Sequence, residues 1–404
     1  MKDQNPNLDY YSLPLRPDQT VTPINLTQQD TDPTADAAQQ PTQPQANAAA
    51  ANAVAANAAA EPLNEEQRAA IARQEKSARR AYSRVGLAIS AMIVVWLALT
   101  FATQMALAIV DPALLQDPVL LLVASNVPLI LVAEPIAYLI MRSLPTRTPE
   151  VKAPIGGAKL TLLLFMSMGI MIVGSLISNI AMSIFTAVSG IELANSLDVI
   201  LDAPIWAITL FAVILAPIFE ELVCRKWILT RLLPYGELPA ILISSALFGI
   251  MHGNLFQFLY AFGVGVLFSL VYLRTGRLRY CITLHVLVNA LGSLVTTVFL
   301  SQMDPELARI MLEGVTEIDP EVYMTLIYEN FVPIMLQGLY TMTQYAMALA
   351  GVILLILAAK KIKLTKREGD LPLGRAVSLA VGSVGGVLLL IVALIFLIIN
   401  MGTF

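Results

Sequence analysis

The sequence predicts an all-α fold: a polytopic transmembrane helical bundle of about eight or nine spans with a disordered N-terminal tail. Of its 404 residues, 57% are hydrophobic and only 13% are charged, whereas an average soluble domain has roughly 25% charged residues. The mean hydropathy is +0.72, and apolar stretches long enough to cross a bilayer recur from Val85 onward. This composition excludes a soluble enzyme. The net charge of −4 gives no reason to expect a nucleic-acid partner.

The N-terminal part of the chain differs in composition from the rest. Residues 1 to about 60 are rich in Pro, Gln, Asn, Thr and Ala, so they bury too little apolar surface to offset the entropy lost on ordering. Residues 62–84 carry many charges in an Ala-rich stretch, which predicts an interfacial helix leading into the bilayer. We therefore divide the chain into a disordered low-complexity tail, 1–83, that ends in this basic helix, and an integral membrane domain, 84–404.

Nine apolar segments of the membrane domain are candidate spans. They are residues 85–110, 118–141, 160–188, 204–224, 238–252, 255–273, 280–300, 333–359 and 376–400. The fifth has only about 15 residues, so we expect a short, packed or broken helix there. Gly382 and Gly386 lie four residues apart in the last segment and predict close helix packing.

The charges between the spans predict the orientation. Lys and Arg are concentrated in every second connection, whereas loop 301–332 has seven acids against Arg309 alone. Because basic loops stay in the cytoplasm, we expect the N-terminus and residues 360–375 to be cytoplasmic and loop 301–332 to face the other side. The expected location is the plasma membrane of a bacterium.

Ionisable side chains within spans are costly and usually functional, and six stand in or at the end of the predicted spans. They are Glu134, Glu220, Glu221, Arg225, His252 and His285. The two histidines are the only ones in the chain. Glu134 precedes Pro135, so it has either a structural role at a proline kink or a supporting role near the site.

Helical spacing assigns different positions to the two adjacent glutamates. Successive residues of a helix differ by about 100° in direction, so Glu220 and Glu221 cannot share a face. Glu221 and Arg225 are four residues apart with the acid first, which is the spacing of a helical ion pair. Glu220 is then free to point into the bundle.

Two further pairs have the same spacing. Phe248 and His252 are four apart, so the phenyl ring can pack beside the imidazole and help to orient it. His285 and Asn289 are also four apart, which places an imidazole and an amide side by side. Neutral His and Asn donors can stabilise a developing oxyanion, and a carboxylate removed from bulk water can act as a general base. The sequence has no His-Glu-x-x-His zinc motif and no Gly-x-Ser-Gly or Gly-x-Gly-Asp motif on a span.

In their order and spacing, the three motifs Glu220-Glu221-x-x-x-Arg225, Phe248-x-x-x-His252 and His285-x-x-x-Asn289 resemble those of the CPBP family. This family includes type II CAAX prenyl endopeptidases and bacteriocin-processing or self-immunity proteins. The resemblance covers a core of about 204–300. It implies an intramembrane glutamic endopeptidase that acts on membrane-associated or lipidated peptides.

The resemblance also implies a role for each motif residue. By position, Glu220 would activate water with the help of His252, and His285 with Asn289 would form the oxyanion site. Glu221 and Arg225 would support these groups.

The depth of His252 is difficult to reconcile with these roles. Glu220 and His285 are expected near the cytoplasmic ends of their spans, but a straight helix starting at Leu238 would carry His252 about 21 Å away. We expect span 204–224 to sit further toward the cytoplasm, span 238–252 to be tilted or re-entrant, and a water-filled cavity to open on the cytoplasmic side.

The same residues allow two mechanisms. Glu220, His252 and His285 could form a zinc site with an open water position, or they could act without a cofactor. We favour the mechanism without metal for two reasons. Asn289 suits an oxyanion donor better than a zinc ligand, and no further Asp or Glu in the adjoining spans is placed to orient a ligating histidine.

Three functions are compatible with the sequence. The first is an endopeptidase whose partners are a peptide or lipidated protein substrate and the bilayer. The second is a non-catalytic membrane binding or immunity protein that keeps the motifs as a polar network. The third is a proton-coupled transporter, which we rank last because the sequence has no matching broken segments in its two halves.

Overall fold

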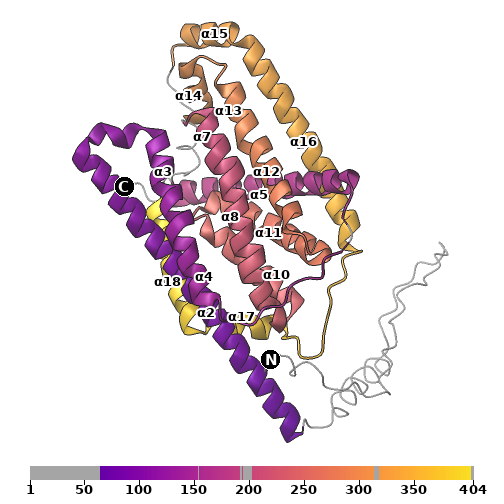
Figure 1. The fold of residues 1–404 in the computed structure, drawn as a ribbon. Coiled ribbons are helices and arrows are strands. Elements are labelled where there is room, and N and C mark those ends of the chain that lie inside the picture. Colours follow the sequence, from indigo (N-terminus) through magenta and orange to yellow (C-terminus); the bar gives the residue numbers. More distant parts are fainter. Residues whose placement is uncertain (1–63, 153, 192, 194–202, 314–317, 402–404) are drawn as a thin grey trace, which may run out of the picture. The chain divides into compact units, whose positions relative to one another are not determined.

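The computed structural model describes residues 64–152, 154–191, 193, 203–313 and 318–401. These residues form helices and connecting segments, with no strand among them, which confirms the predicted all-α class (Figure 1). The predicted disordered tail, up to residue 63, lies outside the described residues. The helices are α2 (Glu65–Val110), α3 (Pro118–Pro128), α4 (Glu134–Met141), α5 (Gly157–Ser189), α7 (Ile205–Ile208), α8 (Ala216–Glu221), α9 (Thr230–Leu232), α10 (Glu237–Met251), α11 (Leu255–Thr275), α12 (Leu278–Asn289), α13 (Val295–Leu300), α14 (Pro305–Glu313), α15 (Pro320–Glu329), α16 (Phe331–Ala359), α17 (Leu373–Val381) and α18 (Val384–Met401).

The first helix runs without interruption through the charged stretch and the first apolar span. It begins at a capping box in which Asn64 and Gln67 satisfy each other's backbone N–H groups, and it ends at Val110, with Asp111 as the C-cap residue. A single helix α2 therefore contains both the segment predicted as an interfacial helix and the first span. The proposed boundary at residue 84 lies within this helix and stays a prediction.

Apart from the fourth and the last, the predicted spans agree with the helices. Eight helical segments among the described residues are long and apolar enough to cross a membrane. A ninth, α10, is apolar but has only 15 residues, as expected for the fifth segment. The molecule is thus a polytopic helical membrane protein. The described part of loop 301–332 contains the helices α14 and α15.

The fourth span is longer than predicted, and this corrects the expected depth of the site. The sequence suggested 204–224, but the helical segment runs from Ile205 to Tyr235. Charged Arg225, Lys226 and Arg231 lie within it, and Arg225 and Arg231 are buried. Glu220 therefore lies midway along the segment rather than near its end. A tilted or re-entrant α10 is not needed to bring His252 to the same depth.

Four π-helical segments interrupt the described helices. They are η3 (Leu129–Ala133), η4 (Thr209–Leu215), η5 (Leu222–Leu229) and η7 (Ala290–Leu294). A π-helical turn widens the helix, changes the direction of neighbouring side chains and occurs frequently at functional sites. Each segment lies next to a candidate polar residue or to the short helix that carries two of them: Glu134 follows η3, α8 with its two glutamates lies between η4 and η5, and Asn289 precedes η7.

The last predicted span is broken, but close helix packing does occur at its glycines. Helix α17 ends before Gly382, and α18 begins at Val384, so Gly382 and Gly386 do not share a helix. The close approach is made by Gly385, which contacts the α2 backbone at Ser83 and Gly86, and the backbone of Gly386 also lies beside Gly86. Glycine permits this approach because it has no Cβ.

The packing of the central helices brings α8, α10, α11 and α12 together (Figure 1). Helix α11 packs against both α10 and α5, while α12 contacts α8 and η4. Further out, α5 packs against α16, and α18 packs against α2. The helix that carries the two glutamates is therefore bordered by the helix that carries His285.

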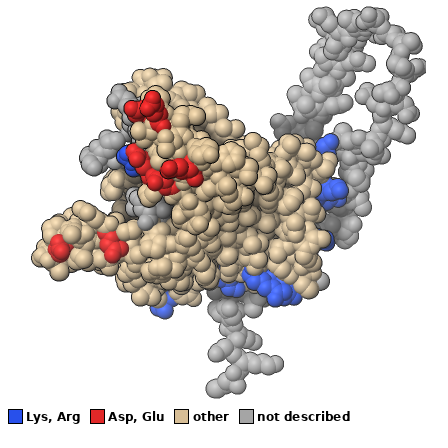
Figure 2. All heavy atoms as spheres, turned by 90° about the horizontal axis from the view of Figure 1, so that it is seen from above, with Lys and Arg blue, Asp and Glu red and all other residues tan. Residues whose placement is uncertain are grey.

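Charged side chains are distributed as the orientation argument predicts. Figure 2 views the end of the molecule that carries α14 and α15, where Asp and Glu gather while most Lys and Arg appear only at the margins. Exposed acids at this end include Asp304, Glu306 and Glu321. The direction in which this end faces the membrane stays a prediction.

The contact between α5 and α16 depends on a glycine. A Cβ atom on Gly351 would overlap the backbone carbonyl of Phe165, so Gly351→Ala is expected to separate the helices and lower the free energy of unfolding by about 1 to 3 kcal/mol. Gly338→Ala on the same helix is the control, since its Cβ would meet nothing within 4 Å. Unfolding in detergent micelles measures both. Equal stability of the two variants would contradict this packing.

Candidate active site

The site is centred on α8, where Glu220 and Glu221 follow each other. The Glu221 side chain is fully buried, whereas that of Glu220 is 26% exposed. The Oε2 atom of Glu220 is itself buried and forms no hydrogen bond within the described part of the chain. The two carboxylates thus have different environments, as the helical geometry predicted.

Glu221 forms the predicted ion pair with Arg225. Arg225 Nε lies 3.0 Å from Glu221 Oε2, and both side chains are 0% exposed. The Arg225 guanidinium also lies over the ring of Phe248, at 4.5 Å from the centroid, and 5.7 Å from that of Phe268. A buried charge pair needs such additional partners, because desolvation otherwise exceeds the Coulomb gain.

His285 lies between the two glutamates. Its Nδ1 is 3.1 Å from Glu221 Oε1, and its Nε2 is 3.7 Å from Glu220 Oε2. The imidazole is buried. Glu221 therefore holds one nitrogen of the ring and leaves the other turned toward Glu220. The sequence placed the glutamates and His285 in one site but did not indicate that one ring contacts both carboxylates.

Phe248 lies between the two histidines. Its ring makes edge-to-face contacts with His252 at 4.9 Å and with His285 at 5.7 Å between centroids. The predicted packing of Phe248 against His252 is thus present. His252 Nδ1 lies 2.8 Å from the Phe248 carbonyl oxygen, and donation from Nδ1 would leave Nε2 free for another partner.

Asn289 has a partner that the sequence did not indicate. Its Nδ2 donates to the Ala212 carbonyl at 2.9 Å, and Ala212 lies in the π-helical segment η4. An amide nitrogen has two hydrogens, so one remains for an oxyanion. The contact fixes Asn289 on the side of α12 that faces the segment carrying Glu220.

Three more residues belong to the site's surroundings. Phe268 of α11 contacts both Arg225 and His285. Glu134 and Tyr260 both interact electrostatically with Glu220. Glu134 is only 2% exposed, and its buried Oε2 has no hydrogen-bond partner among the described residues. For Glu134 this proximity favours the supporting role near the site. Its position next to a proline was the only sequence signal, and Phe268 and Tyr260 had none.

The geometry corrects one argument against a metal. The sequence indicates no further acid placed to orient a ligating histidine, but in the structure Glu221 is in contact with Nδ1 of His285. Within the described ranges, however, no three His, Cys, Asp or Glu side chains converge closely enough to hold a metal ion. The remaining argument against zinc is the position of Asn289 beside His285.

The fold and the site define a polytopic membrane protein with a buried carboxylate–imidazole centre. Residues 202–291, which contain every residue of that centre except Glu134, match the family model described as type II CAAX prenyl endopeptidase Rce1-like. The resemblance carried by the three motifs is therefore confirmed for this part of the chain.

A curated protein is similar to this chain over a stretch of 110 residues. The "Putative membrane peptidase YdiL" of Bacillus subtilis (strain 168) is 36% identical over 110 residues, which are 27% of this chain and 42% of that protein. The chain thus covers less than half of this relative. No solved structure matches the chain.

Proposed function

We propose that the protein is an intramembrane endopeptidase that hydrolyses peptide bonds of membrane-associated or lipidated substrates. The observation that carries this proposal is the position of His285 between Glu220 and Glu221. A proton-accepting carboxylate and an oriented imidazole at one buried point are what the hydrolysis of an unactivated amide requires. The matches to the Rce1-like family model and to the Bacillus protein support the same reaction class.

In this mechanism Glu220 takes a proton from a water molecule while the water oxygen attacks the carbonyl carbon of the peptide. His252 helps to position that water. The carbonyl electrons move to the oxygen, and Asn289 stabilises the resulting oxyanion together with His285, which must carry a hydrogen on each ring nitrogen to donate from Nε2 while Nδ1 donates to Glu221. When the C–N bond breaks, the proton held by Glu220 passes to the leaving amine.

Glu221 and Arg225 act through other residues. Glu221 fixes the His285 ring through Nδ1, and Arg225 neutralises the Glu221 carboxylate. Phe248 packs against both histidines and beneath the Arg225 guanidinium. These three residues keep the reacting groups in one geometry, and a shift of about 1 Å can cost on the order of 100-fold in rate.

Comparison of membrane peptides from cells that carry the wild type or Glu220→Gln tests the proposed function. An endopeptidase produces pairs of new termini that appear only with the wild type. A non-catalytic binding or immunity protein, or a transporter, produces the same peptide termini with both chains. That result would overturn the proposal.

The mechanism without metal predicts insensitivity to chelators. Because Glu220 itself acts as the base, activity of the purified protein is expected to be unchanged after incubation with a chelator and dialysis. His285→Ala and Asn289→Ala should each lose part of the activity, by about 100- to 1,000-fold if each supplies one oxyanion donor. Stoichiometric zinc in the purified protein, with activity lost to chelator and restored by zinc, would establish the zinc alternative with Glu220, His252 and His285 as ligands.

A further inference from the structure

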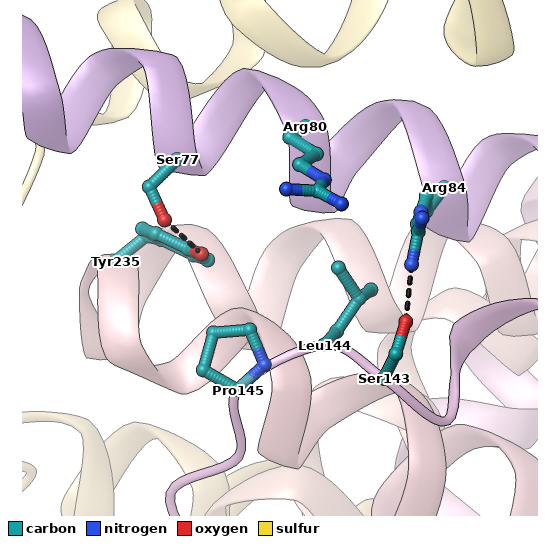
Figure 3. A pocket seen from close by; sticks show the side chains of 7 residues that line it. All are labelled: Ser77, Arg80, Arg84, Ser143, Leu144, Pro145 and Tyr235. Atoms are coloured by element: carbon teal, nitrogen blue, oxygen red, sulfur yellow. Dashed lines mark hydrogen bonds between the residues drawn. The ribbon is translucent and has the colours of Figure 1, made fainter. Parts of the chain in front are cut away.

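A cavity of about 160 Å³ lies away from the candidate active site, at the Lys- and Arg-rich end of the helices. Ser77, Arg80 and Arg84 project into it from α2 (Figure 3). Opposite them are the turn after α4, with Ser143, and Tyr235 at the end of the segment that carries Glu220. The volume is below that of a site for a drug-sized molecule and suits a single small polar group.

The helix itself explains why the two arginines converge. Arg80 and Arg84 are four residues apart, and Ser77 lies three residues before Arg80, so all three occupy one face of α2. Among the described residues, no Asp or Glu lines the cavity. Two guanidinium groups therefore face one small space without a carboxylate.

Arg80 differs from nearby arginines in having no partner among the residues that the structure describes. Arg79, the preceding residue, donates to the Gly382 carbonyl at 3.1 Å, and Arg375 forms a bidentate pair with Glu75. Arg80 forms no hydrogen bond or ion pair within the described part of the chain, while Arg84 donates to Ser143 Oγ. Thus the donors of Arg80 and most of those of Arg84 are unused.

Hydroxyl groups complete the donor set. Because Ser143 Oγ accepts from Arg84, its own hydrogen is free to donate. Ser77 Oγ and Tyr235 Oη are 2.9 Å apart and place two more hydroxyl groups beside the same cavity. Planar guanidinium forks and hydroxyl donors without an acid match the oxygen atoms of a phosphate group.

We propose that this cavity binds a phosphate group, with Arg80 and Arg84 as its principal ligands. The phosphate can be carried by an anionic lipid or be free in solution. The lipid source fits the position of the cavity, because α2 continues from Arg84 directly into its apolar span and clustered basic residues at such a boundary attract anionic headgroups. A bound phosphate would join α2 to the end of the segment that carries Glu220.

The test measures binding and does not require enzymatic activity. In one arm, purified full-length protein in nanodiscs is titrated with phosphatidic acid. In the second arm, the protein in nanodiscs of neutral lipid is titrated with inorganic phosphate. Arg80→Gln is expected to lower the affinity about tenfold or more, as for the loss of a hydrogen bond from a charged donor. Arg80→Lys should also weaken binding, since it keeps the charge but loses the planar fork. A preference for the lipid or for the ion identifies the source of the phosphate.

Arg79→Gln is the matched control, because it removes the same charge from the next position on a different face of α2. It should lower the affinity by at most about fivefold, through the loss of surface attraction alone. Thermal unfolding in neutral detergent verifies that each variant is folded. The proposal would be overturned if Arg79→Gln and Arg80→Gln lowered the affinity equally while Arg80→Lys had no effect. It would also be overturned if the wild type bound neither phosphatidic acid nor inorganic phosphate.

Discussion

Glu220→Gln is expected to lower kcat for peptide hydrolysis by about 100- to 10,000-fold, the typical contribution of a general base. Glutamine has the same shape but cannot accept the proton of the attacking water. The substitution should leave the fold intact, because Glu220 Oε2 forms no hydrogen bond among the described residues and the side chain is partly exposed. Cleavage of a peptide identified in the membrane comparison gives the rate.

Glu66→Gln makes the same chemical change at an exposed position in the first turn of α2. It should retain wild-type kcat. If Glu220→Gln were folded and retained wild-type turnover, Glu220 would not be the base, and Glu134 would be the next carboxyl group to test.

Arg225→Ala is expected to reduce the amount of folded protein as well as activity. The change leaves Glu221 as a buried carboxylate without its cation, 3.0 Å from where the guanidinium was, in a place with 0% exposure. Removal of one partner of a buried pair costs about 3 to 5 kcal/mol. It also removes the cation from the faces of Phe248 and Phe268. Accumulation in membranes and unfolding in detergent measure the loss.

Lys226→Ala provides the control, because Lys226 is exposed and adjacent in sequence. It should accumulate and unfold like the wild type. If Arg225→Ala were as stable as the wild type but inactive, the stability prediction would be wrong. Arg225 would then contact the substrate or the reacting groups directly.

Much of the fold could be predicted because span length and apolar composition are local properties. The predicted span 118–141 coincides with the combined segment Pro118–Met141. Errors arose where polar groups are buried by tertiary contacts. Arg225 and Arg231 suggested that the fourth span had ended, but both are buried inside the protein, and the helical segment continues to Tyr235. The break at Gly382 had a local signal that the span prediction did not use: Gly382 follows the last residue of α17, and Ser383 Oγ accepts from the N–H of Gly386 in the first turn of α18.

In the site, too, contacts within one helix could be predicted from the sequence and contacts between helices could not. Pairs within one helix followed from the spacing, and Glu221–Arg225 and Phe248–His252 are both in contact. Contacts between helices did not follow, because they depend on how α8, α11 and α12 pack. The contact of His285 with both Glu220 and Glu221 is one of these contacts between helices.

The central claim is that this buried centre hydrolyses peptide bonds with water activated by Glu220. The most direct measurement incubates purified protein in nanodiscs with a membrane peptide in ¹⁸O-labelled water and analyses the products by mass spectrometry. The account predicts fragments whose new carboxyl terminus carries ¹⁸O with the wild type, and none above background with Glu220→Gln. Two results would contradict the account. In the first, the folded wild-type protein does not cleave a peptide whose new termini in cells depend on this protein. In the second, the wild type and Glu220→Gln give equal labelling.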